Sequence, residues 1–207
     1  MKKVHYLNQK PEVSKVVCIG RNYVEHIEEL GNEIPSSMVV FNKPNSAISE
    51  KLYYFSEDCR FEGEICFLIR GGRIDAVGFG LDLTLANTQN HLKSKGLPWE
   101  RAKAFDNSAV LSEFVPLDKD IDTLKMKLTI NDELVQFATY DLMIYKPDRM
   151  LSEIQSFMTL EDNDIIMSGT PKGVGTYRLG DRFAGQVFSG DTLLVEGEWV
   201  VEEVGDA

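Results

Sequence analysis

The stretch Phe61-Glu62-Gly63-Glu64-Ile65-Cys66-Phe67-Leu68-Ile69 combines an apolar run with two acids near its start. An apolar run of this length predicts a buried strand. Because side chains alternate along a strand, Glu62 and Glu64 leave the same face, roughly 7 Å apart along the chain. Cys66 and Leu68 continue that face, which becomes apolar beyond the acids, as at the mouth of a core.

Two carboxylates that face one spot in apolar surroundings repel each other and are poorly solvated. They share a proton, find cations or bind a metal. A third acid, Asp82, follows in the next apolar run, Gly78-Phe79-Gly80-Leu81-Asp82-Leu83. Three carboxylates without a cysteine or histidine cluster favour a hard cation such as Mg²⁺ or Mn²⁺. The competing interpretation of Glu62 and Glu64 is an exposed edge strand with solvated acids.

The chain of 207 residues is long enough for one substantial core, and no change in composition divides it. We therefore expect a single domain over residues 1–207, with residues 1–15 as a short N-terminal extension. The formal net charge of -11 repels nucleic acid and anionic membrane surfaces, so neither is expected as a partner.

Cysteine usage and hydropathy bear on the compartment. The cysteines are odd in number, which suits reduced thiols better than a disulfide framework, and Cys18 and Cys66 lie in apolar runs. The first ten residues lack the apolar stretch of a signal peptide. No run approaches the roughly 18 apolar residues of a membrane span. We expect a cytoplasmic protein.

The rest of the pattern predicts more strands than helices. One short helix should follow Gly20-Arg21-Asn22 and end near Gly31. A second should run from Thr84 to Lys95, capped by Asp82 or Thr84. A third, amphipathic helix over residues 150–157 should carry Leu151, Ile154 and Phe157 on one side. Short strands are expected at residues 16–19, 38–41, 124–130, 165–167, 192–195 and 199–204. Strands and helices do not alternate regularly, which argues against a Rossmann fold or a TIM barrel and for a mostly β, α+β class.

Several familiar patterns fail on inspection. Gly169-Thr170-Pro171-Lys172-Gly173-Val174-Gly175 is glycine-rich, but its lysine is misplaced for a phosphate loop. Gly78-x-Gly80 lacks the third glycine of a dinucleotide fingerprint. A nucleophile pair of Cys18 and His26 would need a reactive thiol, yet Cys18 lies mid-strand, where thiols are usually inert.

His26 and Glu29, three residues apart on the first helix, share a face and can interact.

Taken together, six segments resemble the fumarylacetoacetate hydrolase family, and most closely its short bacterial and mitochondrial members related to acylpyruvate hydrolases. The similarity runs from about Val16 to Val204. The segments are Gly20-Arg21-Asn22-Tyr23-x-x-His26-x-x-Glu29, Phe41-x-Lys43-Pro44, Glu62-x-Glu64, Leu81-Asp82-x-Thr84, Pro98-Trp99-x-x-Ala102-Lys103-x-Phe105-Asp106 and Gly169-Thr170-Pro171-x-Gly173-Val174-Gly175.

The resemblance implies the family's mixed β-sheet roll, usually a homodimer, and a set of roles. A triad of acids would hold Mg²⁺ or Mn²⁺, a lysine would neutralise enolate charge, and a histidine and glutamate on a mobile lid would activate water. The metal ligands would be Glu62, Glu64 and Asp82, the catalytic residues His26, Glu29 and Lys103, and the substrate contacts Arg21, Tyr23, Lys43, Gln89 and Thr170, with Thr170 at the substrate carboxylate.

The chain departs from the family pattern after Asp82-Leu83-Thr84. The family commonly has Arg-Asp-x-Gln there, whereas this chain has Ala86-Asn87-Thr88-Gln89. The missing arginine is expected near the substrate, so its loss bears on which substrate is accepted. Ser168, in place of a usual threonine, is a milder change.

The implied reaction is metal-dependent hydrolysis of the C3–C4 bond of a 3-acylpyruvate, a small 2-oxo acid. Decarboxylation of oxaloacetate would give the same pyruvate enolate without an attacking water. Two alternatives stay open from the sequence. One is an isomerase or tautomerase that moves a proton on a 2-oxo acid, and the other is a catalytically weak paralogue that binds 2-oxo acids.

Overall fold

The largest sheet forms around the apolar run that follows Glu64. In the computed structural model, which describes residues 1–31 and 33–205, this run is β6 (Gly63–Arg70). It pairs antiparallel with β7 (Arg73–Asp82) and with β13 (Ile165–Met167). The other strands are β1 (Lys15–Gly20), β2 (Val39–Pro44), β3 (Ile48–Ser49), β9 (Ala109–Leu111) and β10 (Val115–Pro116). The order is β2-β1-β13-β6-β7-β9-β3, with β10 on β7, and the sheet is mixed because β1–β13 and β3–β9 are parallel.

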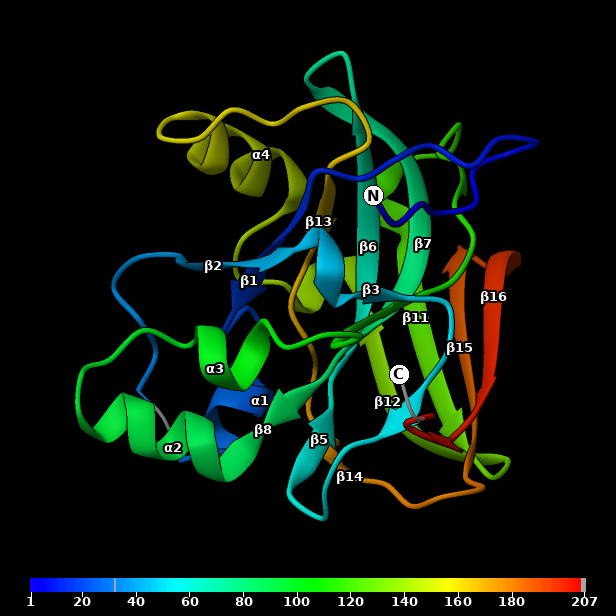
Figure 1. Cartoon of the computed structure of the whole chain (residues 1–207). Helices are drawn as coiled ribbons and strands as arrows, with labels where there is room; N and C mark the ends of the chain where they lie inside the picture. The colour runs from blue at the N-terminus through cyan, green and yellow to red at the C-terminus, as the bar shows by residue number, and fades with distance from the viewer. Residues whose placement is uncertain (32, 206–207) are drawn as a thin grey trace.

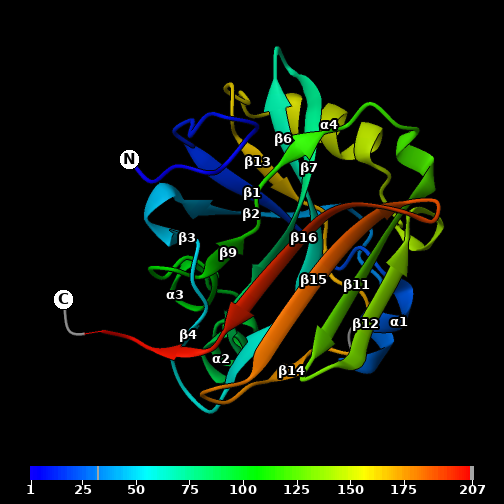
Figure 2. The same cartoon turned by 90° about the vertical axis from the view of Figure 1, so that its right-hand side faces the viewer.

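A second, antiparallel sheet packs across the first (Figure 2). Its strands are β11 (Leu124–Ile130), β12 (Glu133–Thr139), β15 (Arg182–Ser189) and β16 (Thr192–Val200), in the order β12-β11-β15-β16. The two sheets meet closely at Gly185, where an added Cβ would lie 2.2 Å from the ring of Phe79. The rings of Phe79 and Trp199 then pack with centroids 6.1 Å apart. Apolar contact of this kind joins the layers.

Two small groups of strands complete the β structure. One contains β5 (Cys59–Phe61), β8 (Thr84–Leu85) and β14 (Gly175–Thr176), and the other pairs β4 (Tyr53–Tyr54) with β17 (Glu202–Glu203). The strand predicted over residues 61–69 is therefore interrupted at Glu62, which separates β5 from β6. The break arises because β5 pairs with β8 and β14, whereas β6 pairs with β7 and β13.

Three short helices gather at one end of the large sheet and a fourth lies near the other end (Figure 1). The first group contains α1 (Val24–Glu29), α2 (Ala86–Ser94) and α3 (Glu100–Lys103), and the fourth helix is α4 (Pro147–Gln155). Single 3-10 turns occur at η1 (Asn45–Ala47), η2 (Ile121–Thr123) and η3 (Tyr140–Leu142). Strands clearly outnumber helices, so the predicted mostly β class is confirmed.

Both faces of β6 are buried, as the sequence predicts. Ile65, Phe67 and Ile69 belong to the larger apolar cluster, whereas Cys66 and Leu68 belong to a second cluster on the opposite face. The second cluster also takes in side chains from the first 15 residues, including Val4, Tyr6 and Val13. The N-terminal segment is thus packed against the core.

Three boundaries predicted from the sequence are wrong. The second helix begins at Ala86, since Thr84 and Leu85 pair as β8, and neither Asp82 nor Thr84 caps it. The third begins at Pro147, whose fixed φ suits a first helical position, and Phe157 lies beyond its end, 59% exposed. The two strands predicted at residues 192–195 and 199–204 are largely one strand, β16, because its pairing with β15 runs on through Gly197, and only β17 follows.

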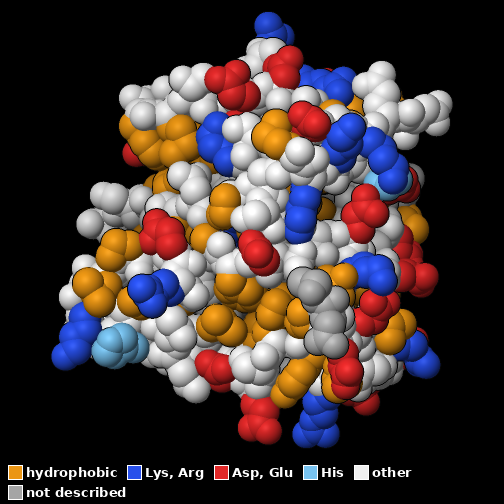
Figure 3. Space-filling view, in the orientation of Figure 1, with side chains coloured by type: hydrophobic (Ala, Val, Ile, Leu, Met, Phe, Trp, Pro, Cys, Tyr) orange, Lys and Arg blue, Asp and Glu red, His pale blue; other side chains and the backbone are white. Residues whose placement is uncertain are grey.

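The surface shows no concentration of positive charge on the face in Figure 3, where Lys and Arg side chains are interspersed with Asp and Glu. Among the described residues, no helix has the length and apolar character needed to cross a bilayer.

Candidate active site

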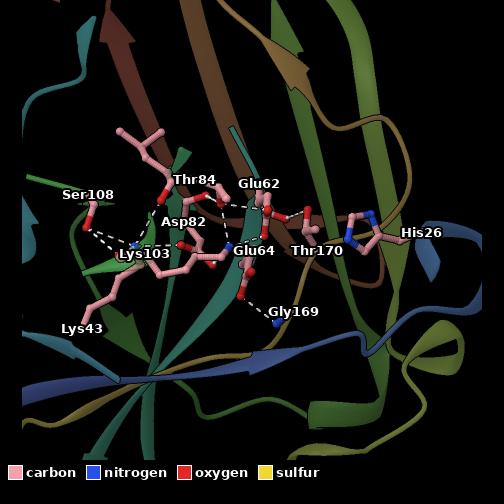
Figure 4. A network of polar contacts seen from close by, with 12 residues as sticks. His26, Lys43, Glu62, Glu64, Asp82, Thr84, Lys103, Ser108, Gly169 and Thr170 are labelled. Carbon is pink, nitrogen blue, oxygen red and sulfur yellow. Dashed lines mark hydrogen bonds and ion pairs between the residues drawn. The ribbon is translucent and has the colours of Figure 1, made fainter. Parts of the chain in front are cut away.

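Three carboxylates converge at the end of the β6–β7 pair (Figure 4). The ladder pairs Gly63 with Leu81, and just beyond it the Asp82 N–H donates to the Glu62 carbonyl at 2.9 Å. This pairing sets Asp82 beside both glutamates. Carboxylate oxygens of Glu62, Glu64 and Asp82 all lie within 4.8 Å of one another. The acids that the sequence singles out are brought together.

The ammonium group of Lys103, at the end of α3, lies between two of these carboxylates. Its Nζ donates to Asp82 Oδ2 at 2.6 Å, to Glu62 Oε2 at 2.9 Å and to Thr84 Oγ1 at 2.6 Å. Burial opposes the charged form, but the attraction of Asp82 and Glu62 outweighs it and raises the pKa of Lys103. Lys103 therefore stays protonated. Its three N–H groups are all engaged, so it can donate to an oxygen that gains negative charge only by releasing one of these acceptors.

Lys43 lies behind the carboxylates, away from the pocket wall. Its side chain is 0% exposed, and Nζ lies 2.8 Å from Asp82 Oδ1. That contact is an ion pair without good hydrogen-bond alignment, because Asp82 Oδ1 has no hydrogen-bond partner among the residues that the structure describes. Nζ donates instead to the carbonyls of Leu83 and Lys103 and to Ser108 Oγ. The structure thus gives no support to the substrate contact expected of Lys43.

The three carboxyl groups of the cluster outnumber its two ammonium groups. Among the described residues Glu64 forms no ion pair, and the Gly169 N–H donates to its Oε2 at 2.6 Å. Burial raises the pKa of Glu64 well above its ordinary value, and the charges of Asp82 and Glu62 add to the rise. At Glu62 burial acts in the same direction, but the charge of Lys103 helps to outweigh it and lowers the pKa.

This donor set fits a divalent cation. It offers oxygen ligands from three acids, of which Glu64 and Asp82 are buried, and its two lysines do not balance three carboxylates. Buried anions without compensation are costly, and hard cations such as Mg²⁺ and Mn²⁺ prefer carboxylate oxygens. The chemistry of the residues therefore agrees with the metal that the sequence predicts.

His26 and Glu29 lie on α1, which faces this cluster. His26 is 6% exposed, and its Nδ1 lies 3.6 Å from Glu29 Oε2, too far for a hydrogen bond. Burial lowers the pKa of His26, although the charges of Glu62 and Glu29 oppose the shift. The imidazole is therefore neutral at neutral pH and can accept a proton. Glu29 also accepts the Gly173 N–H at 3.1 and 3.2 Å, which ties α1 to the glycine-rich loop.

One pocket joins most of the predicted residues. Its wall contains the three acids, Lys103 and His26, together with the predicted substrate contacts Arg21, Gln89 and Thr170. The Thr170 hydroxyl donates to the Gly63 carbonyl at 2.9 Å, so its proton is already engaged. Tyr23 is 2% exposed and lies on the wall of a separate hollow, so it does not join this pocket.

Two polar residues of this region have no role in the sequence interpretation. Lys93 lines the pocket, four residues after Gln89 on α2, and that helical spacing is the signal that would find it. Gln136 is buried, with Oε1 accepting the Gly63 N–H at 2.9 Å and Nε2 donating to Thr170 Oγ1 at 2.9 Å. A polar residue at an inward position of β12 is the corresponding signal.

The thiol of Cys18 plays no part in this pocket. It is buried, and burial raises its pKa well above the ordinary value, with the charge of Asp82 adding to the rise. An inert packing role, as the sequence favours, agrees with this environment.

Comparison with known proteins places the geometry in a family context. The model described as fumarylacetoacetate (FAA) hydrolase C-terminal matches residues 15–206. The chain is 36% identical to oxaloacetate tautomerase YcgM of Escherichia coli (strain K12), over 87% of this chain and 91% of that protein. It is also 36% identical to the mitochondrial oxaloacetate tautomerase FAHD1 of Bos taurus, over 80% of this chain and 83% of that protein.

Solved structures of other proteins are also similar to this chain. The protein in a crystal structure from Oleispira antarctica is 31% identical in sequence, with a TM-score of 0.92 over 98% of this chain and 100% of that chain. The fumarylpyruvate hydrolase of Pseudomonas aeruginosa, in complex with Mn²⁺ and pyruvate, is 26% identical, with a TM-score of 0.88 over 99% of this chain and 97% of that chain. The mixed β-sheet roll expected from the sequence is thereby confirmed.

Proposed function

Because the chain belongs to the fumarylacetoacetate hydrolase family, we propose that it is a divalent-metal-dependent tautomerase that interconverts the keto and enol forms of oxaloacetate. The observation that carries the proposal is the arrangement of one pocket. Protonated Lys103 lies within the acidic triad, and neutral His26 lies on the same wall. The tautomerase names of two relatives that match most of the chain support this choice over the hydrolysis first expected.

The proposed cofactor is Mg²⁺ or Mn²⁺, held by Glu62, Glu64 and Asp82. When bound, the cation supplies Lewis-acid chemistry that withdraws electron density from a 2-oxo acid. The Mn²⁺ and pyruvate in the fumarylpyruvate hydrolase structure support a cation of this kind, without deciding between the two metals.

The side chains supply the proton chemistry. Neutral His26 takes a proton from C3, the C3–H electron pair forms the C2–C3 double bond, and the 2-oxo oxygen receives the displaced pair. Lys103 donates a hydrogen bond to that oxygen as negative charge grows on it. Return of a proton to the oxygen completes the enol. Glu29 acts on His26 only by proximity and by holding α1 against the loop at Gly173.

Hydrolysis of 3-acylpyruvates is a second candidate, favoured by the closeness of His26 to Glu29. In this reaction His26 would take a proton from water, the water oxygen would bond to C4, and the C3–C4 bond would break. Its electron pair would pass into pyruvate enolate, which is then protonated. Decarboxylation of oxaloacetate would break the same bond without water.

The test is a substrate panel with and without Mg²⁺ or Mn²⁺. Ketonisation of enol-oxaloacetate, followed by the loss of its ultraviolet absorbance, should be fast with metal and fall to the solution rate with a chelator. Product analysis for pyruvate, CO₂ and carboxylic acid then measures cleavage. Cleavage of acylpyruvates without accelerated ketonisation would replace tautomerisation by hydrolysis. If metal-dependent binding of oxalate occurs without any turnover, a 2-oxo acid binding protein would be the better description.

The physiological setting stays with the predictions from sequence. We propose that the protein acts in the cytoplasm. Besides the metal, we propose only a small 2-oxo acid and a second copy of the chain as its partners. Light scattering of the purified protein tests the homodimer.

A further inference from the structure

The pocket that contains the acidic triad is also lined by two cations besides Lys103. Arg21, which follows β1, and Lys93, on α2, both line the pocket that contains the triad, Lys103 and His26. The two cations come from segments far apart in sequence. In Figure 1, α2 lies beside α3, and residues of α1, α2 and α3 all line the pocket. Neither the metal nor the proton chemistry proposed above uses Lys93.

The geometry of α2 aims Lys93 at the pocket. Gln89 and Lys93 are four residues apart, so they share a helix face, and both line the pocket. Ala86 is seven residues before Lys93, which again places it on that face, only about 20° away at 3.6 residues per turn. Ala86 is 4% exposed and has no group that binds an anion. Lys93 is thus the cation that α2 presents to the pocket.

The electrostatic environment of Lys93 suits a bound anion. Burial lowers the pKa of Lys93, and the positive charge of Arg21 lowers it further. The two cations therefore repel each other across a partly desolvated space. Arg21 also has a left-handed backbone, with φ of 57°, which is uncommon for a residue other than glycine. A carboxylate between two such cations would relieve their repulsion.

We propose that Lys93, together with Arg21, forms a subsite for the distal carboxylate of a dicarboxylic 2-oxo acid. The C1 carboxylate and the 2-oxo group would lie at the acidic triad and Lys103, and the C4 carboxylate would extend to these two cations. The orientation of the substrate rests on the proposed function, whereas the subsite itself requires only that a dicarboxylate binds here. Lys93 then determines specificity for dicarboxylates over monocarboxylates.

The experiment compares Lys93→Met, Lys93→Arg and the matched control Lys95→Met, which changes an exposed lysine at the end of the same helix. Calorimetry in Mg²⁺ measures the Kd of malate and of lactate, which differ in the distal carboxylate and are not turned over by a tautomerase. Lys93→Met should raise the Kd of malate roughly ten- to hundredfold, as expected for the loss of a charged hydrogen bond, and change that of lactate less than about twofold. Lys93→Arg should restore most of the affinity.

Kinetics separate this proposal from the proposed function. With oxaloacetate, Lys93→Met should raise KM and leave kcat nearly unchanged, while Lys95→Met changes neither. If Lys93→Met binds malate as tightly as the wild type, or weakens malate and lactate equally, the subsite is wrong even when tautomerase activity is present. If the wild type has no tautomerase activity but Lys93→Met selectively loses malate binding, the proposed function is wrong and the subsite stands.

Discussion

The Nζ of Lys103 lies 2.6 Å from Oδ2 of Asp82, while the other oxygen of the same carboxylate faces a second, fully buried lysine. A carboxylate with an ammonium group at each oxygen is fixed in direction, and its charge is largely compensated. Glu62 shares Lys103 with Asp82, so the carboxyl group of the cluster without an ion pair among the described residues is that of Glu64. Because the carboxyl groups are paired differently, substitutions at different positions of the cluster should have different effects on stability and metal binding.

Replacing Lys103 with methionine should slow catalysis and destabilise the metal-free protein. Without the ammonium group, ketonisation should slow by about 10²- to 10³-fold, as for other lost electrostatic donors. Asp82 and Glu62 would lose a buried partner, which should lower the free energy of unfolding by about 3–5 kcal/mol. Added Mg²⁺ should recover part of this stability.

Thermal unfolding with and without Mg²⁺ measures this effect. Lys51→Met is the matched control, since Lys51 pairs with Glu202 at the surface and its loss should leave melting unchanged. A Lys103→Met protein with full activity would contradict the role of the ammonium group.

Replacing Glu64 with glutamine should abolish metal binding without weakening the metal-free fold. The amide oxygen can still accept the Gly169 N–H, and position 64 no longer carries a group that can become a buried charge. Mg²⁺ should raise the melting temperature of the wild type but not that of Glu64→Gln.

The same variant has a pH signature in the absence of metal. Burial raises the pKa of Glu64 in the folded state above its ordinary value of 4.5, which the unfolded chain retains. The folded protein therefore holds this proton more tightly, and the wild type loses stability as pH rises from 4.5 toward the folded pKa. Glu64→Gln lacks this loss, so its advantage in the free energy of unfolding should grow with pH. A constant difference between pH 4 and 8 would show that the carboxyl is not perturbed.

The convergence of the acids is predictable because it needs only local rules. Strand alternation aims Glu62 and Glu64 the same way, and the adjoining apolar run supplies Asp82. The pair of His26 and Glu29 follows similarly from helical spacing. Even the interruption at Glu62 leaves the three carboxylates together.

The positions of the lysines follow from contacts that no local rule contains. The family resemblance implies a substrate contact for Lys43, but the pairing of β2 with β1 and the nearness of α3 bury its Nζ against the Lys103 carbonyl. Gln136 is similar, since its partners Gly63 and Thr170 lie 73 and 34 residues away. Long-range packing decides such side chains, and one sequence does not disclose it.

The pH dependence of activity should report His26. Because burial lowers the pKa of His26 below its ordinary value of 6.5, the neutral base predominates above that pH. We expect kcat/KM to rise with pH to a plateau reached by neutrality, with the midpoint of the acid limb below 6.5.

In His26→Ala the acid limb should disappear and the rate should fall by about 10²- to 10⁴-fold. The control His91→Ala, on the exposed side of α2, should keep the limb and the full rate. A midpoint above 7, or the same limb in His26→Ala, would assign the base to another group.

Lys43→Met tests whether this buried lysine supports the fold from behind Asp82. The substitution leaves four buried acceptors without the ammonium group: the carbonyls of Leu83 and Lys103, Ser108 Oγ and the Asp82 carboxylate. We expect a loss of about 3–5 kcal/mol in the free energy of unfolding, measured by urea denaturation. Ser108→Ala removes one neutral contact of the same Nζ and should cost about 1 kcal/mol. Equal losses for the two variants would mean that charge at Lys43 is unimportant.

Gly173 links the glycine-rich loop to α1, and its substitution tests that link. Its φ is +96°, an added Cβ would lie 2.1 Å from the Val135 carbonyl oxygen, and its N–H donates to Glu29. Gly173→Ala should therefore displace the loop, costing more than about 2 kcal/mol and lowering kcat/KM as α1 loses its anchor. Gly180→Ala is the matched control, because its φ is +83° but no atom of residues 1–31 and 33–205 lies within 4 Å of the added Cβ. That variant should cost about 1–2 kcal/mol and keep full activity. Since both variants carry backbone strain and only one breaks the contact with Glu29, an activity loss shared by both would exclude the anchor as its cause.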